Sequence, residues 1–497
     1  MICYLMMSLP NCRLLRWPLG FALMSLVVLF CGCRSVRPPE PFGACPSPAQ
    51  LQWQRMEMNM FCHFGPNTFT GREWGDGREP DSLFQPLALD CRQWAAVAKA
   101  AGMRGIILTA KHHDGYCLWP TRTSVHSVSA SPWRNGTGDV LSELRRACDA
   151  YGLSMGVYIS PWDRNHPAYG TSGYNDVFAA TLSEVHQAYG PLFEQWLDGA
   201  NGEGPDGKRQ RYDWPLFHRS VYAFSPQAVI FSDVGPGCRW VGNEEGRAGE
   251  TCWSTLNTEG FAPGAEAPPT DTLGHGNCRG SHWVPAEVDV SIRPGWFYHD
   301  SEQPKSLQRL LEIYYASVGR NALLLLNVPP DRRGLIPASD SLRLVEFRAA
   351  LDTIFGVDLA AGAMAEASHV RGCKSALYGP QHLLDTTYHN YWAVDDSACS
   401  PVVTLSFPHL VTFNRVMLQE YIPLGQRVES YHLDYQSADG CWHPLAEATT
   451  IGYKRILLTP TVTARAVRLT IDRSLACPII NRLALFRDTV YTPPVSD

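Results

Sequence analysis

The sequence predicts an α/β fold in which a (β/α)8 TIM-like barrel is followed by an antiparallel β-sandwich domain. Between about residues 50 and 355, short apolar runs alternate with amphipathic helical patterns at the spacing of βα units. Beyond that point the runs alternate with period two and are separated by turns, as in a sandwich. The 497 residues also exceed what a single hydrophobic core accommodates, so at least two domains are expected.

Seven apolar runs in the first region are predicted to be parallel strands, because strands buried on both faces are apolar throughout. They are Met60–Phe64, Gly105–Thr109, Ser154–Ser160, Leu192–Asp198, Ala228–Ser232, Gly295–Tyr298 and Ala322–Val328. An eighth, weaker strand is expected near Glu250–Ser254. Helical patterns lie between the runs, at Cys91–Ala101, Val140–Tyr151 and Asp176–Tyr189.

The second region begins after a helical pattern at Ser341–Ile354. Its period-two runs are Val402–Phe407, Arg415–Glu420, Ser430–Tyr435, Ala466–Ile471 and Arg482–Phe486. We therefore predict a targeting segment at residues 1–33, a linker at 34–49, a catalytic barrel at 50–357 and a discoidin-like sandwich at 358–497. The sandwich is expected to cover and stiffen the barrel. Alternatively, it binds carbohydrate or contributes a loop to the active site, and a structural cation in it is possible.

Residues 1–33 are interpreted as a signal of the bacterial lipoprotein type. Arg13 and Arg16 precede an apolar run from Trp17 to Phe30, which is too short for a confident membrane span. Lipidation at Cys33 would anchor the protein to the outer membrane, at the periplasm or cell surface of a bacterium. Ordinary secretion and a retained anchor are the alternatives. Cleavage would leave 40 basic and 48 acidic side chains, and a mildly acidic chain without a basic run argues against nucleic acid.

The chain has 16 cysteines, of which twelve follow Cys33. They are scattered singly through apolar segments, without a C-x-x-C pair. Because a domain of this size needs no disulfides, buried free thiols are the favoured interpretation, and no zinc site is expected.

Polar side chains follow the ends of the predicted barrel strands, where the catalytic groups of such barrels gather. Asp198 ends one strand before a glycine, and the segment Gly242–Gly246 adds further acids. Paired acids at strand ends are what acid/base cleavage of a glycosidic bond requires. The groups that we expect to bind sugar hydroxyls, or to offer an apolar wall, are His63, Glu73, Trp74, His112, His113, Tyr158, Trp162 and Trp296.

Each of these residues also has a simpler explanation. Asp198 before a glycine is a common turn residue, and a lone histidine is more often structural than catalytic. His112 and His113 could bind a metal, although adjacent residues on an extended chain point to opposite faces and no third ligand is evident. We therefore expect no cofactor. Five successive loops that all carry sugar-binding groups favour the enzyme interpretation.

Several of these segments carry a family resemblance. The chain resembles the α-L-fucosidases of glycoside hydrolase family 29, in the branch selective for α-1,3/1,4-linked fucose. The segments that carry the resemblance span nearly the whole chain after residue 33: His63–Thr70, Glu73–Gly75, Ala110–Gly115, Ser160–Pro167, Trp196–Pro205, Arg239–Glu244 and Gln426–Ser430.

The resemblance implies that Asp198 is the nucleophile and Glu244 the general acid/base of a retaining exo-α-L-fucosidase. It also implies a fucose pocket built from His63, Glu73, Trp74, His112, His113, Tyr158 and Trp296. We add Trp162 and Arg239, from the matching segments, as expected substrate-binding residues. Gly237 departs from the branch, which more often has Asp there, and this leaves the leaving-group site less certain.

Fucosylated oligosaccharides of the Lewis type are the expected substrates, cleaved by double displacement. Glu245 and Glu250 remain rivals to Glu244 as the acid/base. A broad-specificity α-L-fucosidase, or an enzyme for a related 6-deoxy sugar, is the alternative activity. A catalytically inactive protein that captures fucosylated glycans at a surface is the alternative of a different class.

Overall fold

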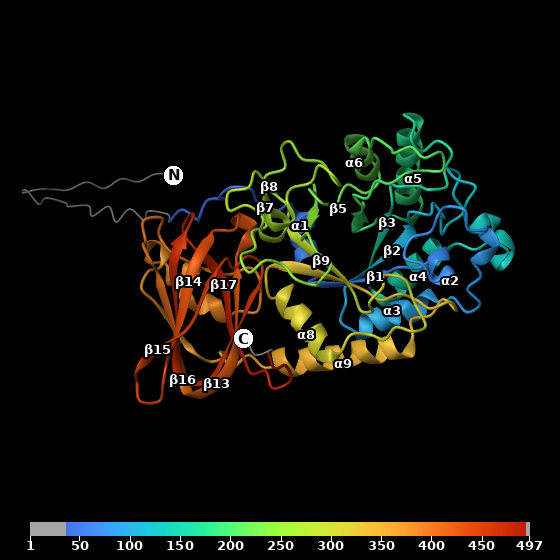
Figure 1. Cartoon of the computed structure of the whole chain (residues 1–497). Helices are drawn as coiled ribbons and strands as arrows, with labels where there is room; N and C mark the ends of the chain where they lie inside the picture. The colour runs from blue at the N-terminus through green and yellow to red at the C-terminus, as the bar shows by residue number, and fades with distance from the viewer. Residues whose placement is uncertain (1–35, 494–497) are drawn as a thin grey trace, which may run out of the picture. The chain divides into compact units, whose positions relative to one another are not determined.

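The computed structural model of this chain describes residues 36–493. Its first domain is a closed barrel of eight parallel strands in the order β1-β10-β9-β6-β5-β4-β3-β2 (Figure 1). The strands are β1 Met58–Cys62, β2 Gly105–Lys111, β3 Ser154–Ile159, β4 Glu194–Trp196, β5 Val229–Ser232, β6 Cys238–Trp240, β9 Ala286–Ser291 and β10 Ala322–Asn327. The fold class predicted from the sequence is confirmed.

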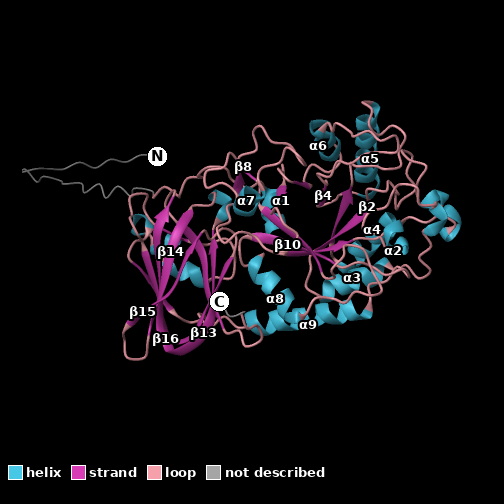
Figure 2. Ribbon diagram, viewed as in Figure 1, coloured by secondary structure: helices cyan, strands magenta, loops and turns pink. Residues whose placement is uncertain are grey.

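Helices lie around the outside of the barrel strands (Figure 2). They are α1 Pro48–Gln54, α2 Pro66–Thr70, α3 Cys91–Ala100, α4 Val140–Tyr151, α5 Gly173–Tyr189, α6 Trp214–Tyr222, α7 Thr270–His275, α8 Leu307–Ala316 and α9 Ala338–Phe355. Local sequence sets their ends. Asp139 caps α4 by accepting a 2.8 Å hydrogen bond from the N–H of Ser142, and Gly152 ends it in the left-handed conformation.

The barrel strands bury both faces, which explains their apolar composition. On β1, Met58, Met60 and Cys62 belong to the core beneath the helices, whereas Phe61 points into the barrel. Inside the barrel, Phe61 packs with Trp196 and Tyr158, with ring centroids 5.4 and 6.0 Å from its own. These rings lie inside the barrel, directly beneath the polar residues at the carboxyl ends of the strands.

Two of the strand predictions were wrong. Gly295–Tyr298 is a loop. Glu250–Ser254 lies outside the barrel, just before β7 Thr255–Leu256, which forms a small antiparallel sheet with β8 His282–Trp283. The barrel positions belong to β9 and β6. Neither strand could be found by searching for an apolar run. Glu287 and Asp289 interrupt the valines of β9, and β6 is only three residues long with Arg239 at its centre.

The second domain consists of antiparallel strands: β11 Met364–Ala367, β12 Trp392–Ala393, β13 Val402–Glu420, β14 Val428–Gln436, β15 Trp442–Thr449, β16 Arg455–Ser474 and β17 Ile479–Phe486. A short helix, α10 Ser375–Tyr378, precedes β12. The long strands β13 and β16 pair along both their halves, with register shifts between them. The first half of β13 pairs with β11 and its second half with β17. The two halves of the sheet enclose one apolar core, as expected of a sandwich.

Buried polar side chains join the barrel to the sandwich. Asn321, just before β10, accepts a 2.7 Å hydrogen bond from the N–H of Tyr453 and donates to the carbonyl of Cys252 at 2.9 Å. Gln426 accepts 2.7 Å from the N–H of Ser254. Asn321 and Gln426 are thus both paired across the junction, which favours one fixed arrangement. The boundary predicted at residues 357 and 358 stays a prediction; α9 ends at Phe355 and β11 begins at Met364.

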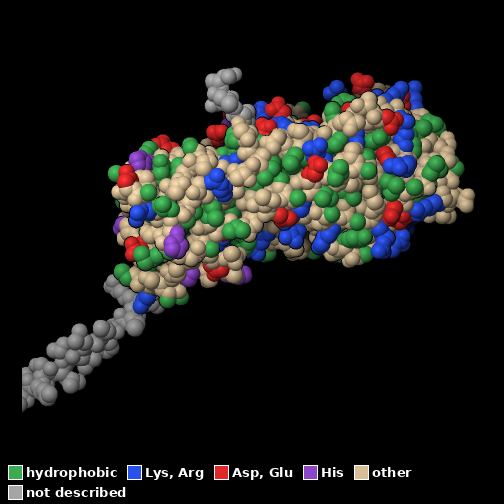
Figure 3. All heavy atoms as spheres, turned by 90° about the horizontal axis from the view of Figure 1, so that it is seen from below, with side chains coloured by type: hydrophobic (Ala, Val, Ile, Leu, Met, Phe, Trp, Pro, Cys, Tyr) green, Lys and Arg blue, Asp and Glu red, His purple; other side chains and the backbone are tan. Residues whose placement is uncertain are grey.

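All twelve cysteines of the described residues are free thiols. Seven of them are buried, as the sequence predicts, but Cys373, Cys399 and Cys441 are exposed. Among residues 36–493, no helix has the length and apolar character needed to cross a membrane. On the face seen in Figure 3, acidic and basic side chains are interspersed.

Candidate active site

A pocket of about 250 Å³ opens beyond the carboxyl ends of the barrel strands. The side chains around it come from the loops that follow β1, β2, β4, β6 and β9, and from the strands β1, β3, β4 and β9. Of the predicted site residues it contains Asp198, Glu244, His63, Glu73, Trp74, His112, His113, Tyr158 and Trp296. Phe61, Trp196, Ala200 and Asp289 complete the lining.

Asp198 is held by donors on both carboxylate oxygens. The hydroxyl of Tyr158 donates to Oδ2 at 2.9 Å, and the N–H of Ala200 donates to Oδ1 at 2.7 Å. Nε2 of His113 lies 3.8 Å from Oδ2. The short strand β4 ends two residues before Asp198. Asp198 therefore lies in the turn after the strand, and the N–H of Ala200 in the same turn holds its carboxylate. These donors hold the carboxylate in one orientation.

Glu244 follows β6 and faces the same pocket. Part of its side chain is exposed at the rim, but burial on the pocket side raises the pKa of this carboxyl group. The carboxylates of Asp198 and Glu73 act in the same direction, whereas the indole N–H of Trp296 donates to Oε2 at 3.2 Å and opposes them. Two carboxyl groups with different environments thus line the same pocket, which is the arrangement that separates an acid from a base.

The rival acids lie outside the pocket lining. Glu245 pairs with Arg247 at 2.6 Å, and Glu250 pairs with Arg320 at 3.2 Å. Both carboxylates are well exposed, with side-chain exposures of 62% and 79%. The structure therefore favours Glu244 over both.

His63 is neutral and its tautomer is fixed. Asn327 donates through Nδ2 to the carbonyl of Trp296 at 2.8 Å, so its Oδ1 must face His63 and accept from Nδ1–H at 2.9 Å. Burial lowers the pKa of His63 to about 3. The imidazole therefore turns an unprotonated Nε2 toward the pocket, where it can accept a hydrogen bond from a sugar hydroxyl.

His112 and His113 present complementary groups. Asn67 donates to Nδ1 of His112 at 3.4 Å, which leaves the proton of that ring on Nε2. The hydroxyl of Ser160 donates to the carbonyl of Trp162, so Ser160 accepts from Nδ1–H of His113 at 2.8 Å and Nε2 is an acceptor. Burial lowers the pKa of His113 to about 4.

The sequence argument that these two adjacent residues point to opposite faces was wrong. Their rings lie with centroids 4.1 Å apart, and both line the pocket. A register shift after Thr109 interrupts the pairing of β2 with β3, and the strand ends at Lys111, so strict alternation no longer applies.

Glu73 and the aromatic residues form the rim. Oε2 of Glu73 accepts a 2.8 Å hydrogen bond from the N–H of Trp296, and Oε1 pairs with Nε2 of His299 at 2.7 Å. Trp74 is 59% exposed, so an apolar ring is free to contact a sugar. Trp162 packs behind it, with ring centroids 5.7 Å apart, and does not line the cavity.

Arg239 lies outside the pocket lining and is not placed to contact a sugar bound there. It is fully buried, and its guanidinium donates 2.9 Å hydrogen bonds to the carbonyls of Leu273 and Trp253 and a further one to the carbonyl of Val284. These hydrogen bonds hold the segments between β6 and β9 against the barrel strand that carries Arg239. Gly237 is also structural, since a Cβ there would approach the main-chain nitrogen of Ile230 to 2.4 Å.

Sequence reasoning missed Asp289. This carboxyl group is 3% exposed, lines the pocket, and has no hydrogen-bond partner for Oδ1 among the described residues. Burial, together with the nearby carboxylate of Glu244, holds its pKa well above the usual range. The sequence did contain a signal, because the acids Glu287 and Asp289 alternate with valines. Such a period-two pattern indicates a strand that turns its polar side chains toward the inside of the barrel.

One group of side chains among residues 36–493 could converge on a metal ion: Glu194, Cys238 and Glu287, inside the barrel. The indole N–H groups of Trp53 and Trp196 already donate to the two carboxyl groups, at 2.7 and 2.8 Å. Burial raises the pKa of Glu194 to about 7, so the pair can share a proton. The predicted cation in the sandwich stays a prediction.

The sequence model of the α-L-fucosidase family matches residues 47–352. This chain belongs to that family, glycoside hydrolase family 29. It is 43% identical to α-L-fucosidase 1 of Arabidopsis thaliana over 472 residues, which cover 94% of this chain and 92% of the relative. It is 45% identical to a putative α-L-fucosidase 1 of rice over 454 residues, covering 91% and 87%.

A solved structure of a Ruminococcus gnavus family 29 fucosidase in complex with fucose is similar, with a TM-score of 0.84 and 31% identity. The match covers 92% of this chain and 97% of that one. The fucosidase described here is accordingly a glycoside hydrolase with α-L-fucosidase activity, and its substrates carry fucose.

The predicted localisation was wrong. The fucosidases of Arabidopsis and rice match this chain over nearly their whole length, and such relatives contradict a bacterial outer-membrane lipoprotein. Neither the lipid anchor at Cys33 nor the signal peptide is supported, and both fall in residues outside the described part of the fucosidase. A short apolar run that ends at a cysteine is too common a pattern to specify lipidation by itself.

Proposed function

We propose that this enzyme is a retaining exo-α-L-fucosidase that removes terminal L-fucose from α-1,3/1,4-fucosylated glycans by double displacement. The observation that supports it is the contrast between two acids in one pocket. Asp198 is held by donors from Tyr158 and Ala200, whereas Glu244 has a raised pKa. A cavity of about 250 Å³ favours a single terminal sugar over the interior of a chain.

In the first step Asp198 attacks the anomeric carbon as the glycosidic bond breaks, and Glu244 donates its proton to the leaving oxygen. A covalent fucosyl-enzyme forms. Glu244, now ionised, removes a proton from water, which attacks the same carbon and releases Asp198. Two inversions return the α-configuration. No cofactor takes part in either step.

The neutral histidines orient the ring during both steps. Nε2 of His63 and Nε2 of His113 each accept a hydrogen bond from a sugar hydroxyl, and Nε2–H of His112 donates one, so three hydroxyl contacts are defined in advance. Contacts of this kind accelerate the reaction where they strengthen as positive charge develops on the ring. Phe61 and Trp196 offer apolar surface to the methyl group of a 6-deoxy sugar.

The decisive experiment uses Asp198→Ala with an aryl α-L-fucoside and azide. We expect loss of hydrolysis, and rescue by azide with formation of the β-fucosyl azide, because azide attacks the carbon from the vacated side. Wild-type enzyme should release α-L-fucose first, as followed by NMR. Release of the β-anomer, or full activity of Asp198→Ala, would refute the proposal.

Linkage preference is tested separately. We expect higher kcat/KM for an α-1,3/1,4-fucosylated Lewis-type trisaccharide than for an α-1,2-linked one, with an aryl fucoside as reference. Equal rates on all three would instead indicate the broad-specificity alternative. Release of free fucose from the trisaccharide excludes the interpretation as an inactive glycan-binding protein.

A further inference from the structure

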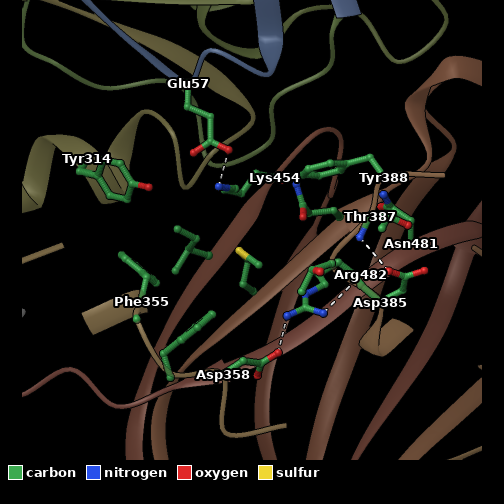
Figure 4. A pocket seen from close by; sticks show the side chains of 16 residues that line it. Glu57, Tyr314, Phe355, Asp358, Asp385, Thr387, Tyr388, Lys454, Asn481 and Arg482 are labelled. Atoms are coloured by element: carbon green, nitrogen blue, oxygen red, sulfur yellow. Dashed lines mark hydrogen bonds and ion pairs between the residues drawn. The ribbon is translucent and has the colours of Figure 1, made fainter. Parts of the chain in front are cut away.

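A second cavity lies between the barrel and the sandwich, away from the catalytic pocket. It has a volume of about 420 Å³ and is bordered by α8, the end of α9, β16, β17 and the loop at 385–388 (Figure 4). Glu57, which borders it, directly precedes β1. The cavity is therefore at the amino-terminal end of the barrel strands, whereas the catalytic pocket opens at the carboxyl ends. Its size lies within the range of small-molecule sites, about 300–1,000 Å³.

Three buried polar side chains face this cavity with hydrogen-bonding capacity that no described residue uses. Gln419 is 2% exposed and donates to the carbonyl of Tyr453, but nothing donates to its Oε1. Tyr314 is 8% exposed, and its hydroxyl makes no hydrogen bond to the described part of the chain. The ammonium of Lys454, also 8% exposed, donates only to Glu57, at 2.6 Å, and retains two N–H groups.

Buried polar groups are almost always paired, so groups left open toward a cavity indicate what the cavity receives. Here the open groups comprise an acceptor, two donors and a hydroxyl that does both. The ligand or water that satisfies them must itself offer both donors and acceptors. Hydroxyl groups meet that requirement.

The remaining wall is apolar. Phe355, Met417, Ile456 and Phe486 line one side, and the ring of Tyr388 stands at the rim, stacked on Tyr453 with centroids 5.9 Å apart. Flat rings and aliphatic surface beside hydrogen-bonding groups match the two kinds of surface on a pyranose, whose C–H faces are apolar and whose edges carry hydroxyls.

The two cationic side chains around the cavity are already paired with carboxylates of the protein. Lys454 pairs with Glu57, and Arg482 pairs with Asp358 (Figure 4). Arg482 also donates to the carbonyls of Leu384 and Asp385. The carboxylate of Asp385 accepts from the N–H of Thr387 at 2.8 Å. An anionic ligand would therefore find no unpaired cation among the described lining residues, and the one acid without a cationic partner, Asp385, is already hydrogen-bonded to neutral donors. A neutral ligand fits this lining best.

We propose that this cavity is an accessory binding site for a neutral monosaccharide in its pyranose form. The occupant's hydroxyls pair with Gln419, Tyr314 and Lys454, and its apolar face packs against Phe355 and Ile456. The fixed junction between the domains keeps the site formed without a ligand. The site is independent of Asp198 and Glu244 and would exist whatever the linkage preference of the enzyme.

The experiment measures binding of D-galactose, N-acetyl-D-glucosamine and L-fucose, one at a time, to the full chain by saturation-transfer NMR titration. Tyr314→Phe removes only a hydroxyl that has no protein partner, and Thr387→Trp blocks the exposed rim of the cavity. Tyr222→Phe, at a partly exposed tyrosine outside the cavity, is the matched control.

We expect at least one sugar to show a binding component that Thr387→Trp abolishes, that Tyr314→Phe weakens roughly three- to tenfold, and that Tyr222→Phe leaves unchanged. Hydrolysis of an aryl fucoside should be equal in all four proteins, which separates this site from the catalytic one. The proposal is overturned if none of the sugars binds, or if binding is the same in wild type, Thr387→Trp and Tyr314→Phe.

Discussion

The indole nitrogen of Trp296 donates a 3.2 Å hydrogen bond to Oε2 of Glu244. The two residues come from loops that follow different strands, β9 and β6, and their contact stabilises the ionised carboxylate against the burial that raises its pKa. The proposed acid/base must be protonated for the first step and ionised for the second. By lowering the pKa of Glu244, this hydrogen bond favours the ionised form that the second step needs over the protonated form that the first step needs.

Trp296→Phe should shift that balance. Without the indole donor the pKa of Glu244 rises further, so the alkaline limb of the kcat/KM profile should move to higher pH. We also expect kcat/KM at neutral pH to fall roughly tenfold through loss of orientation. The profile is measured with an aryl fucoside, and Trp74→Phe, whose indole does not contact Glu244, serves as control. A limb that moves to lower pH would contradict this role of Trp296.

Substitution of the three acids after β6 should separate them clearly. Glu244→Gln should lower kcat/KM on a substrate with a poor leaving group by about 10²–10⁴, the usual contribution of a general acid. Glu245→Gln and Glu250→Gln should stay within roughly threefold of wild type, since both pair with arginines at the surface. If Glu250→Gln showed the large loss instead, the assignment of Glu244 would fail.

Asn327→Ala should disable His63 without changing any predicted sugar-binding residue. The substitution leaves the ring and main-chain N–H groups of His63 without their acceptor, so the imidazole is free to adopt the wrong tautomer. We expect kcat/KM to fall roughly 10–100-fold, the range found when a supporting residue of a catalytic ligand is removed. Circular dichroism checks that the fold is retained. Unchanged kinetics would mean that His63 does not depend on Asn327.

Asp289→Asn tests whether the buried carboxyl group is neutral. If Asp289 is protonated, the amide reproduces its charge and donor, and the alkaline limb of the pH profile stays in place. Asp289→Leu, which removes the polar group, should lower kcat/KM by roughly tenfold or more. A limb that moves to lower pH in Asp289→Asn would show instead that an ionised Asp289 had been raising the pKa of Glu244.

Acid stability should depend on His186, which does not line the pocket. Burial lowers its pKa to about 4 from an ordinary value of 6.5. The unfolded chain therefore binds a proton below pH 6.5 that the folded chain does not, so stability is complete above pH 6.5 and is lost as the pH falls toward 4. The slope is about 1.4 kcal/mol per pH unit.

His186→Gln removes this titration while keeping groups that can pair with Ser225 and Gln195. The free energy of unfolding is measured with urea between pH 7.5 and 4.5. Below pH 6.5 it should fall less steeply with pH in the variant than in the wild type, by about 1.4 kcal/mol per pH unit. An identical dependence in both proteins would exclude His186 as a source of acid lability.

Comparison of particular elements shows where sequence reasoning succeeds. The strands at β1, β2, β3, β5 and β10 are apolar on both faces, so their runs were visible, and the long amphipathic helices α4 and α5 were equally clear. β6 and β9 were not, because Arg239 and Glu287 are buried polar groups whose partners come from distant segments, and Asp289 is a buried acid that lines the pocket. A search for hydrophobic periodicity does not find strands whose buried polar residues are hydrogen-bonded to segments far away in the sequence.

The site shows the same division. The residues at strand ends, from His63 to Trp296, could be assembled from the sequence because the topology of a parallel barrel brings all those ends to one rim. Arg239 was misassigned and Asp289 missed, since whether a side chain enters the pocket depends on the orientation of its strand within the barrel.

The sequence alone determined the two-domain architecture, the family and the residues gathered at the rim, because hydrophobic period and local motifs are properties of neighbouring residues. Only the tertiary structure decided which acid after β6 faces Asp198, which nitrogen of each histidine carries the proton, and that Asp289 is buried beside them. It also revealed the cavity at the domain junction, where Gln419, Tyr314 and Lys454 meet. These features depend on burial and on hydrogen bonds between segments far apart in the chain, and those form only when the chain is folded.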